Sequence, residues 1–141
     1  MSRPDDAPPG FVLSTLRGPF TTHNGPVYHK IEGDRFWQGF RVLPRHCNGH
    51  GIVHGGWLTA FADGVLGMAV WRATQARSVT LRLNADFIGM VRPGEWVEGT
   101  AHLVRATRSL AFARAEITCA GHKVLTADGV FKLMTGSGAK R

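Results

Sequence analysis

The spacing of hydrophobic positions changes at one long segment near the middle of the chain. Residues 55–71 contain no proline and carry apolar side chains around most of a helical circumference, which predicts a buried α-helix. Residues 79–87 alternate strictly instead, which predicts a half-buried strand. The alternation predicts one face of Leu81, Leu83, Ala85 and Phe87 and an opposite face of Thr80, Arg82, Asn84 and Asp86.

Apolar runs separated by turn residues predict further strands on both sides of the helix. These runs are residues 27–31, 36–43, 96–105, 110–119 and 123–133. The last three are joined by short connections, which predicts antiparallel hairpins. A short helix is predicted at 11–16, ending near Gly18-Pro19. The stretch 44–51 is rich in glycine, histidine and asparagine, so it is predicted to be a loop.

The predicted order is two strands, one buried helix and four strands. An α+β fold satisfies this order, with one long antiparallel β-sheet wrapped around a central helix. We expect a single domain at 11–134, a disordered N-terminus at 1–10 and a flexible tail at 135–141. Such a sheet leaves a face and its edges uncovered, so we expect at least a dimer.

Composition narrows the class of partner. The chain has 141 residues, 43% of them hydrophobic, and a formal net charge of +7. Thirteen of its 17 basic residues are arginines scattered along the chain, which suits a small anionic ligand better than nucleic acid. The two cysteines make no disulfide framework, and residues 1–10 have no apolar signal-peptide core. His54, Asp63 and several glycines interrupt the apolar run 52–71, so no membrane helix is expected there. Together with the cysteines and the N-terminus, this predicts a cytoplasmic protein.

Asp63 is the only charged residue between Gly55 and Trp71. A carboxylate on a buried apolar helix is costly without a partner, and such residues are often catalytic or bind ligands. The alternative is a narrow solvent-exposed stripe along the helix, formed by Thr59, Asp63 and Val70.

The segment just before the helix is the second candidate for chemistry. Glycines at a helix start leave backbone N–H groups uncovered, and these can hold an oxyanion or a phosphate. His46, His50 and His54 are four residues apart, but Gly49 and Gly51 disfavour the helix that would align them, so no metal is expected. Cys47 beside a histidine could be a nucleophile, although no third, orienting group is evident.

The motif His46-x-Asn48-x-x-Gly51-x-x-His54-Gly55-Gly56, followed by Asp63, resembles the signature of the PaaI-like, phenylacetyl-CoA-type hotdog thioesterases. Residues 80–87 and Arg92-Pro93-Gly94 are similar to that family's strand after the helix. The resemblance covers roughly residues 25–133. It implies a hotdog fold and hydrolysis of acyl-CoA thioesters without a cofactor. It also implies a site shared between two subunits of a homodimer or homotetramer.

The resemblance also implies roles for individual residues. Asp63 would be the general base or the nucleophile, and the N–H of Gly55 would polarise the thioester carbonyl. Asn48 and His54 would come from the facing subunit and position substrate or water. Thr80 matches a position where a small hydroxyl orients the attacking water.

Residues for binding the rest of the substrate are less specific. Trp57 and Phe61 lie one helical turn apart and could line an acyl pocket, and Gly56 adds a second N–H beside Gly55. Three arginines near turns are candidates for the phosphates of CoA: Arg92, Arg105 and Arg108.

Two other functions remain open at this point. A hydratase or dehydratase acting on an acyl thioester could use the same fold, although the His-Gly-Gly helix start argues against it. A non-catalytic acyl-CoA-binding module would not need the carboxylate of Asp63. Release of free thiol from a panel of acyl-CoAs separates an enzyme from a binder, which would gain thermal stability with ligand but release nothing.

Overall fold

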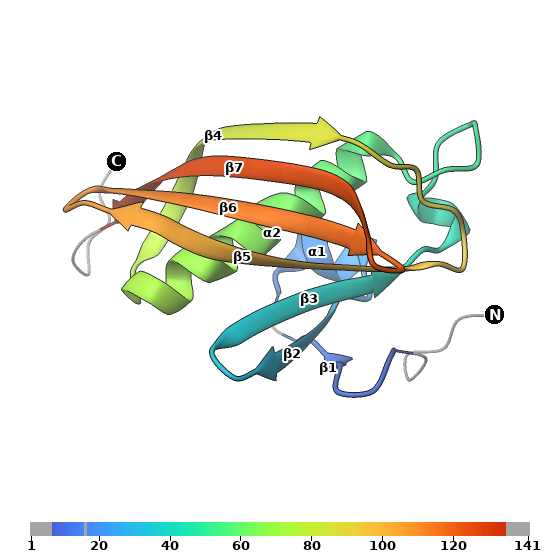
Figure 1. Cartoon of the computed structure of the whole chain (residues 1–141), viewed down its shortest axis with the longest axis horizontal. Helices are drawn as coiled ribbons and strands as arrows, with labels where there is room; N and C mark the ends of the chain where they lie inside the picture. Colours follow the sequence, from blue (N-terminus) through green and yellow to red (C-terminus); the bar gives the residue numbers. More distant parts are fainter. Residues whose placement is uncertain (1–6, 16, 135–141) are drawn as a thin grey trace.

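The computed structural model describes residues 7–15 and 17–134, and the ends predicted to be disordered or flexible lie outside them except for residues 7–10. The described residues form one seven-stranded antiparallel sheet with a long helix against it (Figure 1). In the sheet the strands follow the order β1-β2-β3-β5-β6-β7-β4. The elements are β1 (Val12–Leu13), α1 (Pro19–Asn24), β2 (Tyr28–Glu32), β3 (Arg35–Arg41), a 3-10 turn at Pro44–His46, α2 (Gly55–Thr74), β4 (Arg77–Phe87), β5 (Trp96–Ala106), β6 (Leu110–Cys119) and β7 (His122–Met134).

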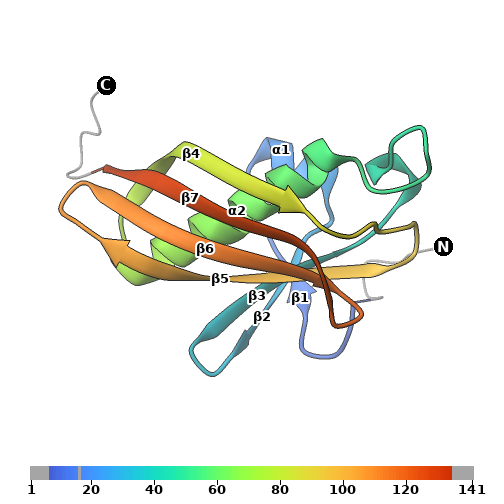
Figure 2. The same ribbon diagram turned by 45° about the horizontal axis from the view of Figure 1, so that its top comes forward.

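Helix α2 packs along one face of the sheet, as the second view makes clear (Figure 2). Its sheet-facing side is apolar and buried, and it meets alanines and aliphatic side chains that alternate along β6 and β7. The predicted buried helix is therefore confirmed, and it continues to Thr74. It ends at Gln75, whose left-handed backbone (φ 57°) lets its N–H bond back to the Trp71 carbonyl at 2.7 Å.

Strand β4 departs from the alternation seen in its sequence. Its register against β7 shifts between Thr80 and Arg82, so Leu81 is an extra residue in a β-bulge. Thr80 stands opposite the buried Phe131, and Leu83 stands opposite the buried Gly129. The prediction that Thr80 faces away from Leu83 is therefore wrong, because the bulge turns Thr80 toward the helix side of the sheet.

The N-terminal segment also differs from the prediction. In place of a helix at 11–16, Val12–Leu13 forms a short strand that pairs with β2. The helix comes later, at Pro19–Asn24. The sequence predicts a helix end near Gly18-Pro19. In the structure Pro19 instead occupies the first position of a helix, where its missing N–H costs nothing.

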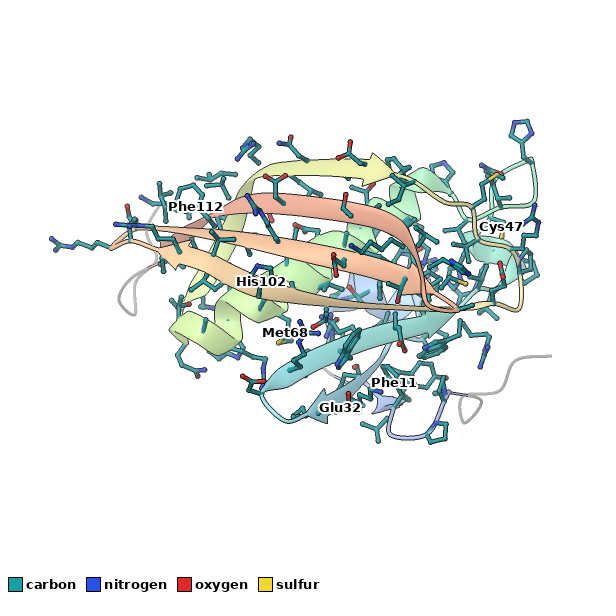
Figure 3. The ribbon with its side chains drawn as sticks, viewed as in Figure 1. Phe11, Glu32, Cys47, Met68, His102 and Phe112 are labelled. Carbon is teal, nitrogen blue, oxygen red and sulfur yellow. The ribbon has the colours of Figure 1, made fainter. Side chains whose placement is uncertain are left out.

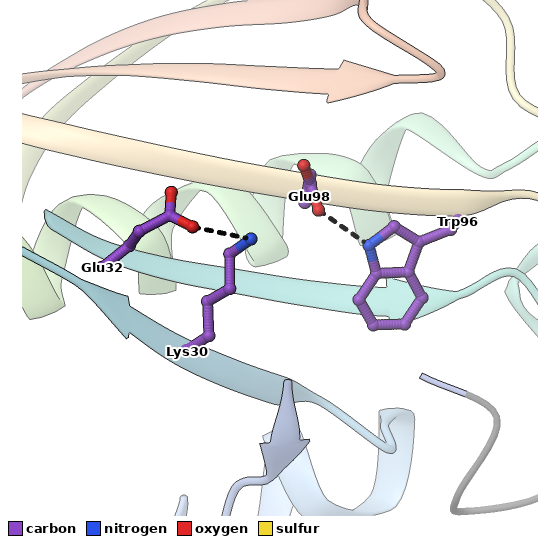
Figure 4. Close-up of polar contacts among 4 residues, drawn as sticks. All are labelled: Lys30, Glu32, Trp96 and Glu98. Carbon is purple, nitrogen blue, oxygen red and sulfur yellow. Dashed lines mark hydrogen bonds and ion pairs between the residues drawn. The ribbon is translucent and has the colours of Figure 1, made fainter. Parts of the chain in front are cut away.

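An aromatic cluster fixes the strands of the N-terminal half to β5. The Trp96 ring covers Gly39, where any Cβ would clash with it, and its indole N–H donates to Glu98 at 2.9 Å (Figure 4). The ammonium group of Lys30 lies 3.6 Å from a Glu32 oxygen and 5.0 Å from the centre of the Phe11 ring. The Phe11 and Tyr28 rings lie 5.0 Å and 5.6 Å from the Trp96 ring, which holds the N-terminal strands against the start of β5.

In the part of the chain that the structure describes, no helix is long and apolar enough to cross a membrane.

Candidate active site

Asp63 of helix α2 contacts Thr80 of strand β4 in the same chain. The Thr80 hydroxyl donates to the Oδ1 atom of Asp63 at 2.7 Å. Asp63 is half-buried in the single chain, whereas Val70 is completely buried. The alternative of a solvent-exposed stripe through Val70 is therefore wrong. The Thr80 contact fixes one carboxylate oxygen and leaves the other able to take a proton or attack a carbon atom.

The start of α2 presents one free backbone donor. His54 is the N-cap residue, and its Nδ1 atom accepts the N–H of Gly56 at 2.8 Å. Within the described residues, the N–H of Gly55 has no hydrogen-bond partner. A Cβ at Gly55 would lie 3.5 Å from the Phe87 ring, so the helix start lies beside the end of β4. Of the two glycine N–H groups, only that of Gly55 is available to a ligand.

Asn48 shapes the loop that leads into the helix. Its side-chain oxygen accepts the N–H of His50 at 2.9 Å and that of Ile52 at 3.4 Å. Val53 then donates its N–H to the Val91 carbonyl at 2.9 Å, which ties the loop to the segment before β5. The amide NH₂ of Asn48 has no partner among the described residues, so it remains free to donate to a bound molecule.

His46 has a structural role. It is 3% exposed, its Nδ1 atom accepts the N–H of Leu43 at 3.0 Å, and its Nε2 atom lies 2.6 Å from the Asn24 carbonyl. These contacts require a neutral ring with its proton on Nε2. Burial lowers the pKa of His46, which also favours the neutral ring. Across residues 7–15 and 17–134, no group of three or more His, Cys, Asp or Glu residues could hold a metal ion.

Cys47 is poorly suited to nucleophilic chemistry. Burial raises the pKa of its thiol, so less of it is in the reactive thiolate form. Its Sγ atom points to the Leu43 carbonyl at 3.6 Å. The second cysteine, Cys119, is also a free thiol and lies buried in β6.

Trp57 and Phe61 pack into an aromatic cluster in the single chain. The Trp57 ring stacks on His46 at 5.3 Å, and Phe40 lies 4.8 Å from Phe61 and 5.4 Å from Trp57. The indole N–H of Trp57 is buried without a partner among the described residues, a cost that a purely structural role leaves unexplained. Their part in an acyl pocket stays a prediction.

The three candidate arginines do not gather at one place in the single chain. Arg92 precedes β5, next to the segment that binds Val53, while Arg105 and Arg108 lie at the other end of β5. The eleven residues of β5 span about 36 Å. One nucleotide therefore cannot contact all three arginines of the same chain.

Asp63 and Gly55 are also separated within one chain. Asp63 is eight residues further along the helix than Gly55, a rise of about 12 Å along the axis. A thioester attacked at Asp63 would place its carbonyl oxygen within about 3 Å of its oxyanion donor. If both groups act on one thioester, the carboxylate near Thr80 and the free N–H near Phe87 are two half-sites of the single chain.

Comparisons with known sequences found similar proteins. A family model described as the thioesterase superfamily matches residues 50–126. A Pseudomonas aeruginosa protein, named as a candidate esterase, is 33% identical over 131 residues, which are 91% of this chain and 98% of that protein. Acyl-coenzyme A thioesterase 13 of Homo sapiens is 28% identical over 90 residues, which are 63% of this chain and 64% of that protein.

Solved structures give the same result. A variant of the phenylacetic acid degradation protein PaaI of Thermus thermophilus superposes with a TM-score of 0.71 at 27% identity, covering 82% of this chain and 98% of that one. The sheet order and central helix are those of the hotdog fold, as the motif around Asp63 implied.

Proposed function

Because the chain belongs to the thioesterase superfamily, and is therefore a thioester hydrolase, we propose that it cleaves acyl-CoA thioesters at a site shared by two copies. The observation that carries this proposal is the separation of its two half-sites. The Asp63 carboxylate and the free N–H of Gly55 are the groups that thioester hydrolysis requires, yet they lie about 12 Å apart along one helix. A second chain brings them together.

The unpaired edge of the sheet supports this assembly. β4 ends the sheet, and its large apolar side chains remain exposed, with Leu81 at 57% and Phe87 at 54%. A long apolar edge strand favours pairing with another strand. Two copies of β4 satisfy each other's free backbone groups and cover these side chains.

The register of such a pair follows from the positions of the half-sites. Asp63 lies beside Thr80, and Gly55 lies beside Phe87. If a two-fold axis passes through Asn84, Leu83 of one chain lies opposite the partner's Ala85, and because the bulge at Leu81 adds one residue, Thr80 lies opposite the partner's Phe87. Each Asp63 then faces the partner's Gly55. One symmetric contact therefore forms two complete sites, each with Asp63 from one chain and Gly55 from the other.

This geometry supports a direct reaction path. Asp63 uses its second oxygen either to take a proton from a water molecule or to attack the thioester carbon itself. The carbonyl oxygen gains charge and is stabilised by the partner's Gly55 N–H, at the positive end of the partner's helix. The C–S bond then breaks, and CoA leaves as its thiolate and takes a proton. With Asp63 as base, the water oxygen remains in the acid. With Asp63 as nucleophile, loss of the thiolate leaves a mixed anhydride, which water hydrolyses to the free acid and the Asp63 carboxylate.

The Asp63–Thr80 contact also weighs against a non-catalytic module. A binding protein does not need a carboxylate held by a hydroxyl at a half-buried position. The test is a panel of aromatic, short, medium and long acyl-CoAs, with free thiol and thermal stability measured together. We expect thiol release from at least one class. Stabilisation by acyl-CoA without any thiol release would identify a binder instead. Consumption of a 2-enoyl-CoA, added to the panel, without thiol release would identify a hydratase.

The first prediction concerns assembly. The protein should be a dimer or a tetramer at micromolar concentration in multi-angle light scattering. Leu81→Glu places a charge in the proposed β4 contact and should shift the mass to the monomer and lower thiol release at least tenfold. Leu13→Glu, at the exposed β1 edge, is the matched control and should keep the assembly. A fully active monomer would refute the shared site.

The second prediction concerns CoA. Arg108 is exposed in the turn between β5 and β6, where a docked nucleotide can reach it. An exposed phosphate contact contributes modestly because water and salt screen it. Arg108→Ala should raise the KM for acyl-CoA severalfold while kcat stays nearly constant. The effect should shrink at high salt and vanish for a truncated thioester without the nucleotide. An equal penalty on the truncated substrate would exclude this role for Arg108.

A further inference from the structure

The sheet opens on the side of α2 away from Asp63. β3 pairs with β5 only from Trp37 opposite Thr100 to Arg41 opposite Trp96. Beyond Thr100, β5 continues to Ala106 while the β2–β3 hairpin turns away from it, as both ribbon views show (Figures 1 and 2). A hollow of about 310 Å³ lies in this wedge, between the hairpin, β5 and the second half of α2.

The hollow has an apolar floor. Val65, Ala69 and Ala73 follow one another on one side of α2 and line it, and Leu103 of β5 closes it from the sheet. These small side chains leave the space that larger residues would fill. At roughly 30 Å³ per non-hydrogen atom, the hollow has room for a molecule of about ten such atoms.

The rim of the hollow is basic. Arg35, Arg72 and His102 line it together with one acidic residue, Asp34. Figure 3 shows His102 on β5, above the gap where β3 diverges. In the described part of the chain, neither Arg35 nor Arg72 forms an ion pair with a carboxylate. The charge of Arg35 acts on Glu116, so Arg72 is the guanidinium group over the apolar floor that no carboxylate offsets, an arrangement that attracts an anion with an apolar body.

The side chain of Arg72 is ordered by an aromatic contact before any anion binds. Its guanidinium carbon lies 5.0 Å from the centre of the Phe36 ring, which also lines the hollow. Stacking on an aromatic face restrains the guanidinium plane and leaves its N–H edge free for two parallel bonds to a carboxylate. Ordering this side chain beforehand lowers the entropy cost of binding.

This hollow is distinct from the Asp63 site. At 100° per residue, Asp63 projects from α2 roughly 160° away from Val65, toward β4 and Thr80. The hollow faces β3 and β5 instead. A ligand there would touch neither the carboxylate of Asp63 nor the proposed β4 contact.

We propose that this hollow is a second binding site, for a small monocarboxylate with an apolar body. Its carboxylate pairs with Arg72, and its hydrocarbon part rests on Ala69, Ala73 and Leu103. The proposal stands on the hollow and its arginines and does not depend on thioester hydrolysis.

The test is an amide NMR titration of the full chain with hexanoate. Hexanoate should shift the amides of Ala69, Ala73 and Leu103 saturably at millimolar concentration. Two probes that each lack one half of the ligand, acetate and 1-hexanol, should bind at least about tenfold more weakly.

Matched variants separate this site from general anion binding. Arg72→Gln should weaken hexanoate about tenfold, while Arg114→Gln, an exposed arginine on the outer face of β6, should bind as wild type does. Arg72 is exposed near the end of α2, so its replacement should leave the fold intact, which the unshifted spectrum of the free variant would establish. Shifts confined to the surroundings of Asp63 and Gly55, an unchanged affinity in Arg72→Gln, or no saturable binding would each overturn the proposal.

Discussion

Asp63→Asn should lower thiol release from acyl-CoA by at least about 100-fold, the usual scale for loss of a base or nucleophile. Asparagine keeps the shape of the side chain, and its oxygen can still accept the Thr80 hydroxyl that now binds Oδ1 at 2.7 Å. What it loses is the charge and the basicity of the second oxygen. The measurement is steady-state thiol release, with thermal unfolding recorded in parallel.

A second aspartate offers a matched control for this variant. Asp128 is also half-buried, but it lies on β7 opposite Asn84, on the face of the sheet away from α2. Asp128→Asn should retain activity within about twofold, because no part of the proposed reaction path includes it. Asp63→Asn should unfold at or above the wild-type temperature. Near-normal turnover in that variant would remove Asp63 from the mechanism.

Gly55→Pro should lower activity by about 100-fold or more, the scale for loss of an oxyanion donor, while the protein stays folded. Proline removes the N–H that has no internal partner, at the first position of α2, where helices accept it. The preceding residue, His54, has an extended backbone (φ −63°, ψ 130°), which is the conformation that proline demands before it. The structure thus has room for this substitution at little cost in stability.

Gly55→Ala distinguishes loss of the N–H donor from the effect of adding a side chain at this position. A Cβ at Gly55 would make an ordinary contact with Phe87 at 3.5 Å, and alanine keeps the N–H. The alanine variant should therefore retain most of the activity that the proline variant loses. An active and folded Gly55→Pro protein, or equal losses in the two variants, would exclude the Gly55 N–H as the oxyanion donor.

The strand and helix order could be predicted because most elements have a distinct local pattern of apolar residues. Residues 55–71 are apolar on most sides, and β6 and β7 alternate along their length, so helix and sheet follow from local pattern. The bulge at Leu81 could not be predicted in the same way. A single inserted residue exchanges the two faces of the strand on one side of the insertion. Only the pairing of β4 with β7 reveals where that residue lies.

The site shows the same division between local and long-range information. Asp63 stands out in the sequence as a lone charge, and Gly55 as a glycine at a helix start. The capping of Gly56 by His54 is local too, but we do not predict it from the sequence, because the family resemblance implies a role for His54 at the substrate or water. Phe87 beside Gly55 was not expected as a neighbour of the helix start. That contact joins residues far apart in the sequence, and it supplies the register of the proposed dimer.

The shared site is tested most directly by a heterodimer of two inactive chains. One chain carries Asp63→Asn and the other Gly55→Pro, and two different affinity tags isolate the mixed dimer after co-expression. If each site takes Asp63 from one chain and Gly55 from the other, one of the two sites is wholly intact, and the heterodimer should show about half the wild-type rate of thiol release. If both groups act within one chain, neither site is intact, and a heterodimer as inactive as its two parent homodimers would contradict the account.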